Sequence, residues 1–143
     1  MNISNYIKIN DQISTAGQPT KEELRQIAKE GFEVVINLAP HDKGTLNDED
    51  RIVSESGMIY FHLPISWETP QVDRLQLFLM LLKTLEEEKK SVFIHCVKNY
   101  RVSVFMHMYK KFVWGLKDVE FVAPAEYEPN AVWQEILNME LEI

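Results

Sequence analysis

Short apolar runs that alternate with helical patterns constrain the fold of this 143-residue chain more than any other feature. Three such runs occupy Val34–Leu38, Met58–Leu63 and Val92–His95. Each is the length of one strand and largely apolar, which is typical of strands buried on both faces of a parallel sheet. The order of strands and helices predicts one α/β domain over residues 1–143, with a mostly parallel central sheet flanked by helices.

Turn and capping residues mark the ends of the predicted elements. Residues 6–15 have the pattern of a short hairpin. Thr20 and Glu23 form a capping box that opens the first helix, because each can bond the backbone N–H of the other. Apolar residues at helical spacing in 130–139 predict a closing helix.

Two further helix starts are predicted from single residues. Asn47 is expected to cap a helix that ends at Gly57, because asparagine side chains accept from the free amides of a first turn. Thr69 is expected to cap the next helix, with Pro70 in its first position. Proline is favoured there because that position has no intrahelical partner for an N–H.

The single cysteine of the chain, Cys96, follows the predicted strand Val92–His95 and precedes a helical pattern. Amide N–H groups at a helix start are unpaired, and the helix dipole is positive there, so an anion such as a thiolate is favoured. Arg101 follows closely and offers a planar fork of donors to an oxyanion. The segment therefore predicts a cradle for a tetrahedral anion.

A second loop is expected beside the cysteine loop, because ligands of parallel sheets bind outside the carboxyl ends of the strands. Glu68 lies in the loop that follows Met58–Leu63, between Trp67 and Pro70. Such a loop can move over a bound ligand. Asp73, one turn inside the next helix, is the alternative acidic candidate.

Composition limits the compartment and the partners. The 15 basic and 22 acidic residues give a net charge of −7, which disfavours nucleic acid and anionic membranes as partners. One cysteine allows no internal disulfide, and the chain start lacks a signal-peptide pattern. No apolar run approaches the roughly 20 residues of a membrane helix. We therefore expect a cytoplasmic protein; its oligomeric state is not predicted.

No metal or cofactor is expected. His41, Asp42 and His62 lack the spacing of a metal-ligand set. The tail aromatics are expected to pack in the core rather than to form a stacking platform for bases; they are Trp114, Tyr127 and Trp133.

The segment around Cys96 resembles the cysteine-dependent protein phosphatases, especially the small dual-specificity type. The resemblance is carried by His95-Cys96 after an apolar strand, by Arg101 and Ser103 entering a helix, and by the acidic loop upstream. Residues 13–19, with the strand that ends at Leu38, resemble more closely a bacterial group of phosphatase-like domains. The resemblance covers roughly residues 5–115 and implies a phosphotyrosine-phosphatase-like fold.

The spacing within the loop departs from the phosphatase signature, which has five residues between cysteine and arginine where this chain has four. Ser103 keeps its distance from Cys96, but Val102 now follows the arginine. The loop has no glycine, so Asn99 is the residue expected to adopt an unusual backbone angle. The bacterial group shares the shorter spacing, and so do rhodanese-type sulfurtransferases, where a smaller ring surrounds a persulfide.

The phosphatase resemblance implies a role for each site residue. Cys96 would attack phosphorus and form a phosphocysteine. Glu68, or Asp73 in its place, would protonate the leaving oxygen. Ser103 would donate to the thiolate in the second step, and His95 would orient the loop from behind. The phosphate oxygens would be held by the arginine and the loop amides; this loop comprises Val97, Lys98, Asn99, Tyr100, Arg101 and Val102.

The implied partner is a phosphorylated small molecule or protein, with a phosphate or sulfate ion as a ligand of the loop. Two alternatives stay open. One is a rhodanese-like sulfurtransferase that carries a persulfide on Cys96. The other is an inactive anion-binding or interaction module.

Overall fold

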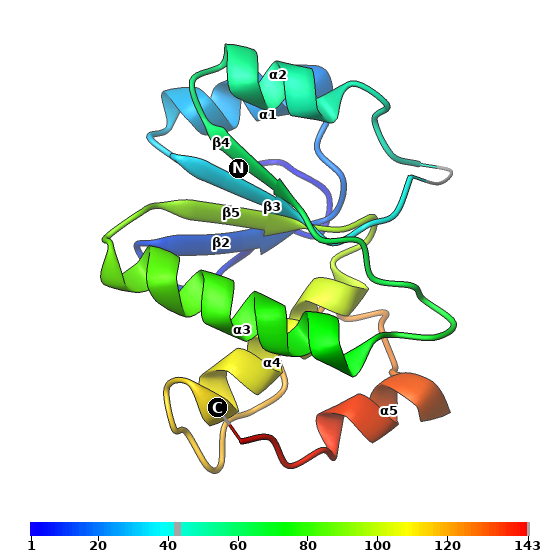
Figure 1. The fold of residues 1–143 in the computed structure, drawn as a ribbon. Coiled ribbons are helices and arrows are strands. Elements are labelled where there is room, and N and C mark those ends of the chain that lie inside the picture. The colour runs from blue at the N-terminus through cyan, green and yellow to red at the C-terminus, as the bar shows by residue number, and fades with distance from the viewer. Residues whose placement is uncertain (42–43, 143) are drawn as a thin grey trace.

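A computed structural model describes residues 1–41 and 44–142 of the chain (Figure 1). Its sheet has five strands in the order β1-β2-β5-β3-β4. Their bounds are β1 Ile7–Lys8, β2 Ile13–Ala16, β3 Val34–Asn37, β4 Ile59–His62 and β5 Val92–His95. The hairpin pair β1–β2 is antiparallel and the other pairs are parallel. The predicted α/β class with a mostly parallel sheet is confirmed.

Helices cover both faces of the sheet (Figure 1). Their bounds are α1 Lys21–Lys29, α2 Glu49–Glu55, α3 Val72–Glu87, α4 Tyr100–Phe112 and α5 Ala131–Leu137. The pair α1 and α2 lies on one face, α3 and α4 lie on the other, and α5 packs beside α4. Within the described ranges, no helix is both long enough and apolar enough to cross a bilayer.

Alternation along the buried strands divides the core into two layers, because successive side chains of a strand point to opposite faces. In β5, Val92 and Ile94 join the cluster under α3 and α4, whereas Phe93 joins the cluster under α1 and α2. All three side chains are fully buried. Burial of each such side chain stabilises the fold by about 1.5–3 kcal/mol, which explains why these strands are apolar throughout.

The capping box of α1 is confirmed, and the two other predicted helix starts are wrong. Asp48 rather than Asn47 precedes α2, and its carboxylate pairs with side-chain cations instead of the helix amides. Gln71 rather than Thr69 precedes α3. Thr69 is used in a local turn, where its amide and its hydroxyl both donate to Ser66 Oγ at 3.2 and 3.1 Å.

The tail folds back onto α4 through His107, whose ring meets that of Phe121 with centroids 5.6 Å apart. Its Nδ1 is buried without a hydrogen-bond partner in the part of the chain that the structure describes. Burial, together with the charges of Lys111 and Lys110, lowers the pKa of His107 below its usual value. The folded state therefore favours the neutral ring.

This histidine gives a pH dependence to stability. The unfolded chain binds the His107 proton at higher pH than the folded chain does. The contribution of His107 to the free energy of unfolding is therefore complete above about pH 6.5, and it is lost as pH falls through the folded pKa. We expect His107→Gln to reduce the loss in free energy of unfolding between about pH 7.5 and 5.5, measured by urea denaturation. The exposed His41→Gln serves as control; an unchanged pH dependence in His107→Gln would contradict the assignment.

Candidate active site

Three neighbouring strand ends meet at one edge of the sheet, the edge where ligands of parallel sheets bind. His95, the last residue of β5, stands in register between Ala16 of β2 and Asn37 of β3. Cys96 follows at once, so the segments after β2 and β3 lie on either side of it. The Leu38 amide donates to the His95 carbonyl at 2.9 Å and extends the pairing up to the cysteine.

A cavity of about 480 Å³ opens at this edge. Its walls come from three loops; the lining residues are Pro40, Ser66, Trp67, Glu68, Cys96, Val97, Lys98, Tyr100 and Arg101. The cysteine is only 1% exposed, whereas Glu68 is exposed. The structure therefore brings Cys96, Arg101 and Glu68 to one cavity, where the cysteine is buried and the glutamate is exposed.

The first three carbonyls of the cysteine loop all accept hydrogen bonds from outside the loop. His95 Nδ1 donates to the Cys96 carbonyl at 3.0 Å, and the Gln18 amide donates to the Val97 carbonyl at 2.9 Å. Asn5 Nδ2 donates to the Lys98 carbonyl at 2.9 Å. In a trans peptide, the N–H of the next residue points away from the carbonyl. The amides of Val97, Lys98 and Asn99 are therefore turned away from these donors, and Val97 and Lys98 line the cavity. Convergent amides of this kind bind anions.

Asn99 makes the sharp turn from the loop into α4. Its φ of 66° and ψ of 17° are left-handed, which confirms the unusual backbone angle predicted there. The side chain is fully buried, and its Nδ2 donates to the Asn5 carbonyl at 2.9 Å and to Thr15 Oγ1 at 3.0 Å. These bonds hold a conformation that asparagine tolerates better than most residues with a side chain.

Gly17 allows the segment after β2 to touch the cysteine loop. A Cβ at this position would lie 2.5 Å from the Val97 carbonyl oxygen, closer than any side chain can approach a backbone atom without displacing it. The absence of a side chain therefore lets the following residue, Gln18, bond that carbonyl.

Arg101 is the second residue of α4 and is half-buried at the cavity. Its Nη1 donates to the Ile65 carbonyl at 2.9 Å, which connects the guanidinium to the segment between β4 and α3. Because a guanidinium has five N–H donors in one plane, this bond fixes its orientation and leaves further donors for a ligand. The same β4–α3 segment carries Glu68.

Other predicted site residues do not face the cavity. Ser103 is buried, and its hydroxyl donates to the Asn99 carbonyl at 2.5 Å, so its proton is committed to the loop backbone. Val102 is buried in the core. Asp73 is exposed on α3 and is absent from the cavity lining formed by the described residues. His95 is fully buried behind the loop.

Two buried contacts behind the loop were missed by sequence reasoning. The Glu49 carboxylate lies 2.5 Å from His95 Nε2 and accepts from Gln18 Nε2 at 2.6 Å. Nothing in the local sequence distinguishes Glu49 from its acidic neighbours, since a run of acidic residues at a helix start is ordinary. Its role is visible only through its partners.

The tail, expected to supply packing aromatics, also contacts Tyr100, which lines the cavity. Tyr127 stacks on Tyr100 with ring centroids 4.3 Å apart, and Tyr100 donates to Glu126 at 2.9 Å. Burial raises the pKa of Tyr127 to about 12, and Coulombic interactions with Cys96 and Tyr100 add to the rise. Trp133 is buried in the core as expected, and its Nε1 donates to the Trp67 carbonyl at 2.9 Å.

The histidines considered as metal ligands serve local contacts. His62 Nε2 pairs with the Ala39 carbonyl at 2.7 Å, and its ring meets that of His41 edge to face at 5.2 Å. Asp42, the third residue of that set, lies outside the described residues. In the two described ranges, no three His, Cys, Asp or Glu side chains gather as a ligand set.

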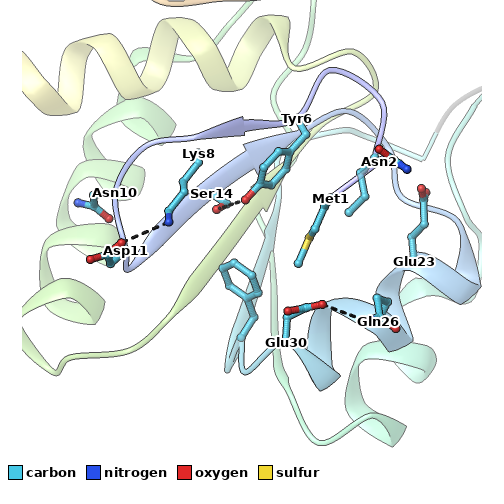
Figure 2. Close-up of a pocket in the computed structure, with 12 residues that line it drawn as sticks. Met1, Asn2, Tyr6, Lys8, Asn10, Asp11, Ser14, Glu23, Gln26 and Glu30 are labelled. Atoms are coloured by element: carbon cyan, nitrogen blue, oxygen red, sulfur yellow. Dashed lines mark hydrogen bonds and ion pairs between the residues drawn. The ribbon is translucent and has the colours of Figure 1, made fainter.

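A second cavity, of about 560 Å³, lies between the chain start, the β1–β2 hairpin and α1 (Figure 2). Six of its polar side chains bond one another in pairs. The pairs are Lys8 with Asp11 at 3.2 Å, Tyr6 with Ser14 at 2.9 Å and Gln26 with Glu30 at 2.9 Å. None of the groups that form the cysteine site lines this cavity.

Comparison with known proteins gives relatives for most of the chain. Residues 11–101 match the family Tc-R-P, described as a polymorphic toxin system, DSP-PTPase phosphatase. A beta-lactamase hydrolase-like protein of Xylella fastidiosa is 26% identical over 99 residues, which are 66% of this chain and 22% of that protein. This chain therefore spans about a fifth of the length of the curated relatives it matches.

Solved structures share the fold over most of this chain. A phosphatase-like DUF442 protein from Shewanella putrefaciens CN-32 is 27% identical with a TM-score of 0.85, and the match covers 95% of this chain and 90% of that one. Tk-PTP in its active form is 21% identical with a TM-score of 0.80, covering 93% of both chains. TpbA of P. aeruginosa, solved with pTyr, is 17% identical with a TM-score of 0.65, covering 79% of this chain and 66% of that one. The last two show the fold alone. By the match over residues 11–101, the chain belongs to the DSP-PTPase phosphatase family of polymorphic toxin systems.

Proposed function

We propose that this chain hydrolyses phosphate monoesters through a phosphocysteine intermediate on Cys96. The observation that supports the proposal is that Cys96, Arg101 and the loop residues Val97 and Lys98 all line one cavity. Amides and a guanidinium together match the oxygens of a phosphoryl group and favour a thiolate beside them. Membership of a phosphatase family supports the same reaction.

The first step transfers the phosphoryl group to sulfur. The Cys96 thiolate attacks phosphorus, the Sγ–P bond forms and the bond from phosphorus to the leaving oxygen breaks. Glu68 donates its proton to that oxygen, so the alcohol or phenol leaves neutral. The Arg101 guanidinium and the loop amides hold the non-reacting oxygens, where charge spreads in a loose transition state.

The second step returns the enzyme to its starting state. A water attacks the phosphocysteine while the Glu68 carboxylate takes its proton, and the S–P bond breaks to release phosphate and the thiolate. Ser103 is assigned to bracing the loop rather than donating to the thiolate, because its hydroxyl already bonds Asn99. We propose no metal and no cofactor in either step.

The proposed substrate is a phosphorylated small molecule or protein. Trp67 and Tyr100 line the cavity beside the carboxylate and the thiol, and they suit an apolar or aromatic leaving group. TpbA, which shares the fold, has been solved with pTyr. Free phosphate or sulfate is the proposed ligand of the cysteine loop, held by Arg101 and the loop amides.

A second candidate reaction is sulfur transfer, which the loop of four residues between Cys96 and Arg101 favours by its small ring. In that reaction the thiolate accepts a sulfane sulfur as a persulfide, and no general acid is needed. Glu68 at the cavity and the phosphatase family favour hydrolysis. A chain with neither activity would be an anion-binding module.

A side-by-side assay decides among these functions. The purified chain is offered an aryl phosphate in one reaction, and thiosulfate with cyanide in another, with Cys96→Ser as the control in both. We expect phosphate release from the wild type alone and no thiocyanate. Thiocyanate without phosphate release would establish the sulfurtransferase instead, and silence in both with retained phosphate binding would leave the binding module.

The leaving-group dependence of the reaction tests Glu68. We expect Glu68→Gln to lower kcat by about 10²-fold for a substrate with a poor leaving group, and by less as the leaving group improves. The reason is that only a poor leaving group requires a proton from the protein. Asp73→Asn is the matched control, because Asp73 is exposed outside the cavity lining. A loss in Asp73→Asn but not in Glu68→Gln would make Asp73 the acid.

A further inference from the structure

We propose that Glu49 is a positioning residue for the cysteine loop, anchoring the two residues that hold its first two carbonyls. The inference rests on the proposed role of Cys96 as nucleophile. Glu49 is the first residue of α2 and is only 2% exposed. Its Oε2 lies 2.5 Å from His95 Nε2, and its Oε1 accepts from Gln18 Nε2 at 2.6 Å.

Both partners of Glu49 bond the loop directly. His95 Nδ1 donates to the Cys96 carbonyl at 3.0 Å, and the Gln18 amide donates to the Val97 carbonyl at 2.9 Å. These two carbonyls set the direction of the next two amide N–H groups, which point away from the His95 and Gln18 donors. One buried carboxylate therefore stands behind two of the amides proposed to stabilise the thiolate and the phosphoryl oxygens.

Both ring nitrogens of His95 are engaged, one with the Cys96 carbonyl and the other with Glu49. The Cys96 carbonyl can only accept, so Nδ1 of His95 carries a hydrogen. The contact between Nε2 and the Glu49 carboxylate needs a hydrogen of its own, carried by the ring or by the carboxyl. The pair thus holds two protons and no net charge. Without the partner, the Nδ1 bond to the Cys96 carbonyl is the one contact of this pair that still orients the ring.

Loss of the anchor has a specific consequence for chemistry. If the ring turns, the peptide between Cys96 and Val97 is free to rotate, and its N–H leaves the cavity side of the loop. The thiolate and the transition state then lose a hydrogen-bond donor. The bound substrate depends on this donor less than the transition state does, because preorganised donors act mainly on developing charge. The expected signature is a fall in kcat and in thiol reactivity with little change in KM.

Three variants test the proposal, each followed by steady-state hydrolysis of an aryl phosphate and by the alkylation rate of Cys96 with iodoacetamide. We expect Glu49→Ala to lower kcat by about 10- to 100-fold and to slow alkylation, with KM nearly unchanged. Glu49→Gln should stay within about threefold of the wild type, because its amide can donate to a neutral His95 and accept from Gln18. Asp50→Asn, the exposed neighbour on α2, should be unchanged.

Glu49→Met, which fills the same volume, replaces Glu49→Ala if that variant does not fold, as judged by its urea denaturation curve. Wild-type kcat and alkylation in the folded variant would overturn the proposal. So would a Glu49→Gln variant as slow as Glu49→Ala. The alkylation rate reports the reactivity of the Cys96 thiol and does not require hydrolysis. A wild type that is alkylated rapidly but hydrolyses nothing would therefore refute the proposed function, while the test of Glu49 would still be valid.

Discussion

Cys96→Ser is expected to abolish phosphate-ester hydrolysis, lowering kcat by about 10³-fold or more. A serine hydroxyl keeps its proton at neutral pH, and the described cavity lining offers no histidine beside it to take that proton. The measurement is turnover of an aryl phosphate, together with mass spectrometry of acid-quenched wild-type protein. We expect a phosphoryl adduct on the peptide containing Cys96 in the wild type and its absence from the variant.

Phosphate binding provides the control for this variant. Because Arg101 and the loop amides are untouched, Cys96→Ser should bind inorganic phosphate with an affinity close to that of the wild type in calorimetry. Retained binding with lost turnover separates the nucleophile from the cradle. Undiminished hydrolysis by Cys96→Ser would eliminate the phosphocysteine mechanism.

Arg101→Lys is expected to lower kcat/KM by about 10²- to 10³-fold, although it preserves the positive charge. The planar guanidinium can bond the Ile65 carbonyl and an anion at once, whereas an ammonium group is a point charge without that geometry. Steady-state kinetics on an aryl phosphate measures the loss. Urea denaturation should show a free energy of unfolding within about 1.5 kcal/mol of the wild type, since one hydrogen bond changes.

Lys98→Ala is the matched control for charge. Lys98 lies in the same loop and lines the same cavity, but its side chain is exposed. We expect a loss of less than about fivefold, because an exposed charge is screened by water and salt. If Lys98→Ala were as damaging as Arg101→Lys, net charge rather than the arginine fork would account for binding.

The strands could be predicted because a short run of apolar residues indicates a buried strand. A run such as Val34–Asn37 can be satisfied only inside a sheet covered on both faces, and the structure places it there. Helix starts were less predictable. Thr69 has the chemistry of a cap, yet its hydroxyl bonds Ser66, a local competitor that leaves Gln71 before α3.

The site divides in the same way. The positions of Cys96 and Asn99 follow from a strand that runs into a helix through a short loop, which is a local pattern. The contacts of Ser103 and Glu49 could not be predicted from this local pattern. A serine near a cysteine can serve the thiol or the backbone, and only the packed loop shows that its proton is taken by Asn99.

The sequence by itself determined that a thiol, several free amides and an arginine would occur together where a buried strand meets a helix, because each depends on neighbours a few residues away. Only the tertiary structure decided which way those amides face. Their direction is set by carbonyl partners far along the chain, such as Asn5, which is 93 residues from Lys98. The orientation of a peptide plane is fixed when its carbonyl accepts from a donor. Here the donors are Asn5 near the chain start, Gln18 after β2, and His95, which contacts Glu49 on α2.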